Sequence, residues 1–125
     1  MSLVTFDKPY LFIAICLTTG VFVLGGQAWS ATLIGGAVPH WHYFAHFASF
    51  AIIALSYARA LPRIPLLIIA CVAVAVGGLH ELYQLLTPNH DAELDDFLVN
   101  AAGAICGTLA SRTLFALLQR TLRPS

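Results

Sequence analysis

Long apolar stretches alternate with short polar breaks along the chain, and this pattern predicts four membrane-crossing helices. A helix needs about 20 residues to cross a hydrocarbon core of ~30 Å, because each residue rises ~1.5 Å. Stretches of that length lie at about 9–28, 41–61, 65–86 and 95–118, and proline-containing breaks separate them. We therefore expect an all-α fold, a four-transmembrane-helix bundle with short loops, as a single domain over residues 1–125.

The fourth stretch is the shortest in uncharged residues. Only positions 97–111 lie between Asp96 and Arg112, which is roughly 22 Å of helix. Two alternatives follow from this. Arg112 either extends its side chain toward the headgroups so that one helix continues to about residue 118, or the chain bends there into an amphipathic surface segment.

The composition narrows the class of protein. Apolar residues make up 59% of the chain and charged residues only 10%, whereas a soluble domain carries roughly 25% charged residues. Positions 9–58 contain no Asp, Glu, Lys or Arg at all. These features exclude a soluble enzyme, a disordered chain and a nucleic-acid binder, and they predict a multi-pass protein whose principal partner is the lipid bilayer.

The distribution of charge predicts the orientation. With the N-terminus in the cytoplasm, all six Lys and Arg fall on or near the cytoplasmic side, as the positive-inside rule requires. Five of the six acidic residues and all five histidines then fall toward the outer side, which gives an N-in/C-in topology. A cleaved signal peptide ending near Ala28 is the alternative, but cleavage would leave three spans and misplace the C-terminal arginines.

Polar side chains gather on one face of three of the spans, near the outer ends. Positions three, four or seven apart share a helix face, and this spacing relates His42 to His46, Glu81 to Gln84, and Asp96 to Asn100. The candidate ligand-binding residues are His46, Glu81, Gln84, Asp96 and Asn100. Polar residues inside a membrane favour a functional role, although a simple hydrogen bond or ion pair between Glu81 and His46 is an equally good explanation.

Small residues and potential metal ligands have simpler explanations. The Gly103-x-x-x-Gly107 spacing favours close helix packing over ligand contact. His80 and Glu81 are ligand types, but adjacent residues point about 100° apart on a helix. No HExxH or CxxC motif occurs, and the three cysteines lie singly on different spans. The sequence therefore predicts no cofactor and no metal site of known spacing, and a metal bound by the outer histidines and acidic residues stays an open alternative.

The order of the motifs resembles the VanZ-like family of small membrane proteins. The resemblance covers roughly residues 38–111 and rests on these segments: His42-Tyr43-Phe44-Ala45-His46-Phe47, Glu81-x-x-Gln84, Pro88-Asn89-His90 and Asp96-x-x-x-Asn100-x-x-Gly103-x-x-x-Gly107. The family has Asp-Lys where this chain has His42-Tyr43, and Gly-Arg where it has Asn89-His90. The resemblance implies the bacterial inner (cytoplasmic) membrane and an envelope role connected with resistance to the antibiotic teicoplanin.

Two functional hypotheses follow. In the first, the outward-facing polar pocket binds an envelope lipid, a lipid-linked precursor or a lipophilic glycopeptide, which would affect glycopeptide susceptibility. In the alternative, the protein is a membrane-embedded hydrolase or transferase in which Glu81 and His46 are an acid–base pair, with Asp96 nearby. A small multidrug transporter is disfavoured because the first span lacks a carboxylate. Two further alternatives stay open: the protein forms a homo-oligomer, or a membrane partner docks on the glycine-rich fourth span.

Overall fold

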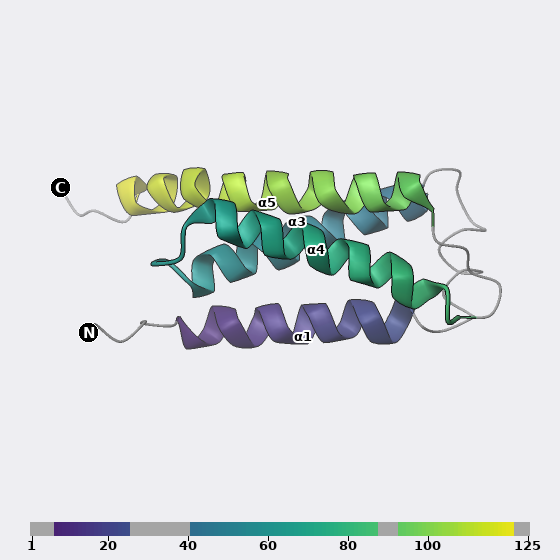
Figure 1. Ribbon diagram of the computed structural model, residues 1–125. Coiled ribbons are helices and arrows are strands. Elements are labelled where there is room, and N and C mark those ends of the chain that lie inside the picture. Colours follow the sequence, from purple (N-terminus) through teal and green to yellow (C-terminus); the bar gives the residue numbers. More distant parts are fainter. Residues whose placement is uncertain (1–6, 26–40, 88–92, 122–125) are drawn as a thin grey trace.

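Four helices lie side by side in the computed structural model, which describes residues 7–25, 41–87 and 93–121. They are α1 (Lys8–Gly25), α3 (Trp41–Ala60), α4 (Leu66–Gln84) and α5 (Leu94–Thr121) (Figure 1). Within these ranges the regular structure is all helical. The start of α1 and the end of α5 lie at one end of the bundle, which we call the basic end, whereas α3 and α5 begin at the other end.

The helix boundaries follow local sequence signals. Pro65, with φ −55° and ψ 135°, precedes the first residue of α4, since proline fits the start of a helix better than its interior. The backbone N–H of Leu61 bonds to Tyr57 and that of Ile64 to Leu61, which closes the turn between α3 and α4. The four predicted helical segments are therefore all present, with ends that differ by a few residues.

The helix α5 continues through Arg112 to Thr121. A single helix over this range agrees with the first alternative for the fourth stretch, and a break at Arg112 into a separate surface segment is not observed in α5. The Arg112 side chain is exposed. Parts of other predictions lie outside the described residues, namely the end of the first stretch beyond Gly25 and the Pro88-Asn89-His90 motif.

Small residues bring the helices together in the core. Gly103 and Gly107 of α5 lie against the backbone of Phe47 and Ala51 in α3, so closely that a Cβ atom at either glycine would collide with it. A buried cluster of Ala54, Ala73 and Ala104 joins α3, α4 and α5. Close backbone approach through Gly and Ala is typical of helix pairs in membranes, and the packing role predicted for the two glycines of α5 is confirmed.

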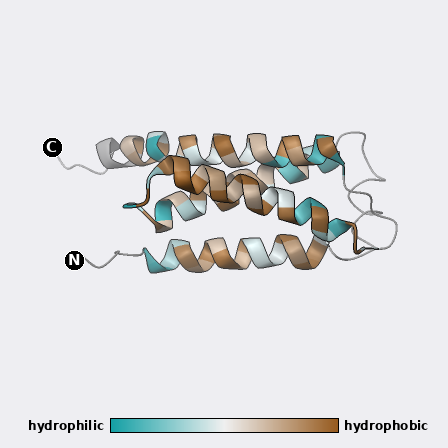
Figure 2. Ribbon diagram, in the orientation of Figure 1, coloured by the Kyte–Doolittle hydropathy of each residue, from teal (hydrophilic) through white to brown (hydrophobic). Residues whose placement is uncertain are grey.

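The outer surface of the bundle is apolar. Phe12, Leu67 and Leu109 are 70%, 75% and 62% exposed, and Figure 2 shows hydrophobic residues along much of the helices. Within the described residues, α1, α4 and the segment Leu94–Leu117 of α5 are each long and apolar enough to cross a membrane. Because water would not favour so much exposed apolar surface, the structure indicates a membrane protein.

Helix α3 differs from the other three. It has 20 residues, a length of about 30 Å, but it is not among the helices apolar enough to cross a membrane on their own. Polar residues such as His42, His46 and Arg59 lower its hydropathy. The helix packs against all three others, so neighbouring helices cover much of its surface.

Aromatic contacts hold the helices at the basic end. The Arg59 guanidinium lies 5.0 Å from the ring centre of Tyr10 in α1 and 4.3 Å from that of Phe115 in α5. The backbone N–H of Asp7 donates to the carbonyl of Ala60 at 3.0 Å. These contacts connect three helices through one arginine, with cation–π distances in the favourable range of up to about 6 Å.

Candidate functional site

Polar side chains of three helices meet at the end of the bundle opposite the basic end. Helix α3 contributes His42 and His46 from its first two turns, and α5 contributes Asp96 and Asn100 from its first two turns. Helix α4 runs in the opposite direction and contributes residues from its last turns. We call the following residues the polar cluster: His42, His46, His80, Glu81, Asp96 and Asn100.

Asn100 of α5 connects α3 and α4 at the centre of the polar cluster. Its Nδ2 donates a hydrogen bond to Oε1 of Glu81 at 2.6 Å, and its Oδ1 lies 2.9 Å from Nδ1 of His46. The side chain is completely buried. Because a carboxylate only accepts hydrogen bonds, this orientation of the amide places Oδ1 where it accepts a hydrogen bond from the Nδ1–H of His46.

Asp96 lies beside the two histidines of α3. Its Oδ2 is 3.8 Å from Nε2 of His46, and its Oδ1 is 3.7 Å from Nε2 of His42. His46 therefore has a carboxylate near each ring nitrogen, since its Nδ1 is also 3.7 Å from Oε1 of Glu81. These separations are longer than direct hydrogen bonds, and they leave the carboxylates facing the imidazole without a short contact.

His80 lies deeper among aromatic rings. Its ring centre is 5.4 Å from that of Phe22, 5.8 Å from that of Phe50 and 5.7 Å from that of His46, all in edge-on geometry. Its Nδ1 lies 3.5 Å from Oε1 of Glu81. The sequence-based expectation that the 100° helical separation would keep His80 and Glu81 apart is wrong, because both side chains turn toward the same space.

Several buried polar atoms of the cluster have no hydrogen-bond partner among the described residues, namely His80 Nε2, Glu81 Oε2 and Asp96 Oδ1. An unpaired buried polar atom costs about 1–3 kcal/mol, and more for a charged group. No Lys or Arg occurs at positions 9–58 or 64–111, which include all the described residues at this end of the bundle. Among the described residues the two carboxylates therefore face imidazoles, with no Lys or Arg to balance their charge.

Four of the five candidate residues predicted from the sequence lie together, namely His46, Glu81, Asp96 and Asn100. Gln84 is also buried, at 4% exposure, one turn further along α4 from Glu81, but no hydrogen bond joins it to those four. His80 belongs to the same cluster and was not among the candidates. The sequence indicated this only through the position of His80 next to Glu81. The 100° rotation between adjacent helix residues argued against a shared site.

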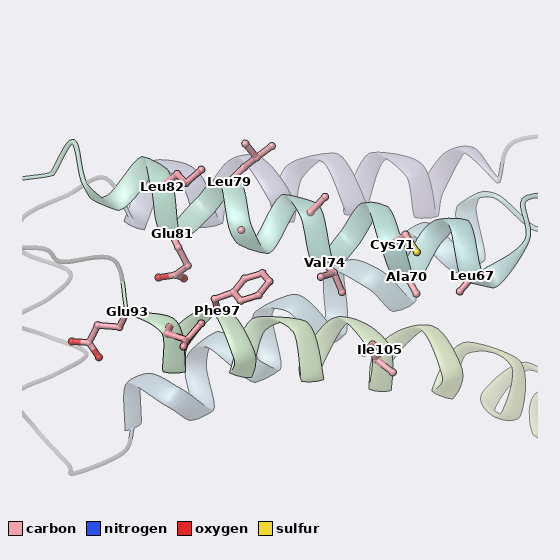
Figure 3. A pocket seen from close by; sticks show the side chains of 13 residues that line it. Leu67, Ala70, Cys71, Val74, Leu79, Glu81, Leu82, Glu93, Phe97 and Ile105 are labelled. Carbon is pink, nitrogen blue, oxygen red and sulfur yellow. The ribbon is translucent and has the colours of Figure 1, made fainter.

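An apolar groove between α4 and α5 leads to the polar cluster (Figure 3). Its volume is about 970 Å³, near the upper limit of the ~300–1,000 Å³ typical of small-molecule sites. On α4 its lining extends from Leu67 to Leu82, which corresponds to about 22 Å along the helix. Glu81 and Glu93 line the groove at the cluster end, and Phe97 lies between them and its apolar part.

No family model, curated protein or solved structure matches the chain. The function is therefore argued from the geometry and chemistry of the site. Its residues offer two kinds of interaction, a long apolar surface and a compact group of imidazole, carboxylate and amide groups at one end. A molecule with an apolar chain and a polar head would match these two parts of the site.

Proposed function

We propose that the chain crosses the membrane four times with both termini in the cytoplasm, as an inner-membrane protein of the VanZ-like type. Helix α3 would then cross with its polar residues covered by the other helices. The start of α1 and the end of α5 lie at the same end of the bundle, where Arg59 also lies, and this arrangement supports the topology. A fluorescent protein that matures only in the cytoplasm, fused to the C-terminus, is expected to fluoresce, whereas a periplasm-dependent phosphatase fusion there is expected to stay inactive.

The function that we propose is the binding of an envelope lipid, a lipid-linked precursor or a lipophilic glycopeptide. The main observation behind this proposal is that Glu81 both lines the apolar groove and belongs to the polar cluster. An apolar chain would lie along α4 and α5, and its polar head would reach Glu81. The groove length of about 22 Å exceeds the ~15 Å of hydrocarbon in one leaflet, so a single acyl or isoprenoid chain fits within it.

The chemistry of the cluster specifies the polar head. Glu81 Oε2 and Asp96 Oδ1 are buried acceptors with no hydrogen-bond partner among the described residues, so a hydroxyl or amine that donates hydrogen bonds would satisfy them. Sugar or amine head groups carry such donors. A bound head group would thus remove the cost of the unpaired acceptors, which gives binding its specificity.

Photocrosslinking with a lipid probe tests this proposal. Ala75 is exposed and lines the groove, so Ala75→Phe fills the groove without disturbing the core and is expected to reduce labelling several-fold. Ala102 is equally exposed on α5 but outside the groove, and Ala102→Phe is the matched control that keeps full labelling. Equal labelling of both variants, or labelling that Glu81→Gln does not reduce, would contradict lipid binding at this site.

A second candidate function is a membrane-embedded hydrolase or transferase that acts on an envelope lipid. The chain of contacts from His46 through Asn100 to Glu81 favours it, because an imidazole linked to a carboxylate can take up or deliver a proton. In this second proposal Glu81 is the general base and His46 is its partner. Product formed from lipid by the wild type and lost in Glu81→Gln would establish it, and binding without any turnover would exclude it.

A further inference from the structure

We infer that His46, His80 and Glu81 form a binding site for a divalent transition-metal ion of the Zn²⁺ class. These three residues each offer one ligand atom, and the three atoms lie within 4.8 Å of one another. Two of the residues come from α4 and one from α3. The sequence contains no metal-ligand spacing of a known kind, because a site shared between two helices has no such spacing along the chain.

The distances suit coordination to one ion. Nδ1 of His80 and Nδ1 of His46 lie 3.5 Å and 3.7 Å from the same carboxylate oxygen, Oε1 of Glu81. Ligand atoms bound to Zn²⁺ at ~2.0–2.1 Å in a tetrahedron are about 3.4 Å apart. Two of the three separations are therefore close to those of a tetrahedral site, and all three ligand atoms lie within 4.8 Å of one another.

The buried negative charge of the site is an independent indication that it can bind a cation. Glu81 is 4% exposed, and its Oε2 has no hydrogen-bond partner among the described residues. None of the described residues at this end of the bundle is a Lys or Arg. A cation bound between the two imidazoles and the carboxylate would compensate the buried negative charge, which otherwise is costly in a membrane.

The donor set selects the kind of metal. Two imidazole nitrogens and one carboxylate oxygen suit Zn²⁺ and other first-row transition metals, whereas Ca²⁺ and Mg²⁺ require mainly oxygen ligands. Three protein ligands leave a fourth position for water or for a polar group of a ligand. Asn100 contacts two of these ligand atoms, since its Oδ1 is 2.9 Å from Nδ1 of His46 and its Nδ2 bonds to Oε1 of Glu81. Metal binding would therefore replace the proton on Nδ1 of His46 and displace these two hydrogen bonds.

Metal binding is measured on the full chain in detergent, purified with a tag that contains no histidine and stripped with a chelator. The wild type is expected to bind one Zn²⁺ per chain in calorimetry. Co²⁺ is expected to give the intense visible bands of a tetrahedral site, which an ion on scattered surface groups does not give. These measurements do not depend on any lipid, so their outcome is separate from that of the crosslinking test above.

Variants locate the ion. Glu81→Gln and His80→Phe are each expected to weaken Zn²⁺ binding at least ~100-fold, more than the loss of an outer-shell partner. Asn100→Ala is expected to retain binding, because it frees Nδ1 of His46 and Oε1 of Glu81. Cys16→Ala is the control, because this exposed thiol of α1 is a potential metal ligand outside the site, and it is expected to leave binding unchanged. His42→Gln tests the neighbouring group of His42, Glu93 and Asp96. Circular dichroism of each variant shows whether its helices have formed.

Three results would overturn the inference. One is a wild-type Co²⁺ spectrum without tetrahedral bands, which needs no variant and so does not depend on variant folding. Another is Zn²⁺ affinity that persists in a folded Glu81→Gln protein. The third is loss of binding in His42→Gln with Glu81→Gln unaffected, which would place the ion in the neighbouring group instead.

Discussion

The two sides of α5 form very different contacts with their neighbours. Toward α3, Gly103 and Gly107 bring the helix against the backbone of Phe47 and Ala51. Toward α4, side chains such as Phe97 and Ile105 line an open groove. The same helix therefore forms one interface that leaves no space for a methyl group and one that leaves about 970 Å³.

This difference separates the part of the molecule that fixes the fold from the part that is free to accommodate a ligand. Backbone contacts cannot move aside without displacing a whole helix, whereas side chains at a groove can rotate. The α3–α5 pair is thus the rigid unit, and α4 lies against it with the polar cluster as a connection at one end. Substitutions on the two sides of α5 should have correspondingly different effects.

The largest effect is expected from Gly107→Ala. The new Cβ would collide with the backbone of Ala51, so the helices must separate, which costs about 3 kcal/mol or more. Gly20→Ala is the control, since a Cβ there meets nothing within 4 Å and should stabilise α1 by up to ~1 kcal/mol. Detergent-induced unfolding followed by circular dichroism measures the stability of both variants. If Gly107→Ala is no less stable than Gly20→Ala, the rigid interface is contradicted.

An intermediate effect is expected from Asn100→Leu. This residue connects α5 to both neighbours, and its loss leaves Glu81 and His46 without their shared partner, at a cost of about 1–3 kcal/mol. Thr108→Val is the matched control, because Thr108 is also fully buried. Its hydroxyl donates only to the carbonyl of Ala104 within its own helix, at 2.7 Å, and its replacement should cost less than ~1 kcal/mol.

The smallest effect is expected from Gly78→Ala, on the groove side. A Cβ at this position meets the Phe97 ring at 3.4 Å, an ordinary contact with a side chain that can shift. Any crowding is offset by the better helix propensity of Ala, so unfolding should change by less than ~1 kcal/mol. A destabilisation as large as that of Gly107→Ala would show that both sides of α5 are equally rigid.

The sequence was sufficient to predict the helices, because their length and apolar character depend on local composition. It also predicted the face on which Asp96 and Asn100 lie, since helix periodicity fixes which residues share a side. The position of His80 depends on side-chain rotation near a neighbouring helix, which periodicity does not describe. The groove depends on how far α4 stands from α5, and no single helix contains that information.

The low hydropathy of α3 has a consequence for the synthesis of the protein. Ribosomes make α3 before α4 and α5, so the helix that carries His42 and His46 emerges before the helices that provide Glu81, Asn100 and the glycines that cover it. Its polar face has no partner on those helices during this interval, and polar groups without partners resist entry into lipid. In the proposed four-span topology, stable insertion of α3 should therefore wait for the synthesis of α4 and α5.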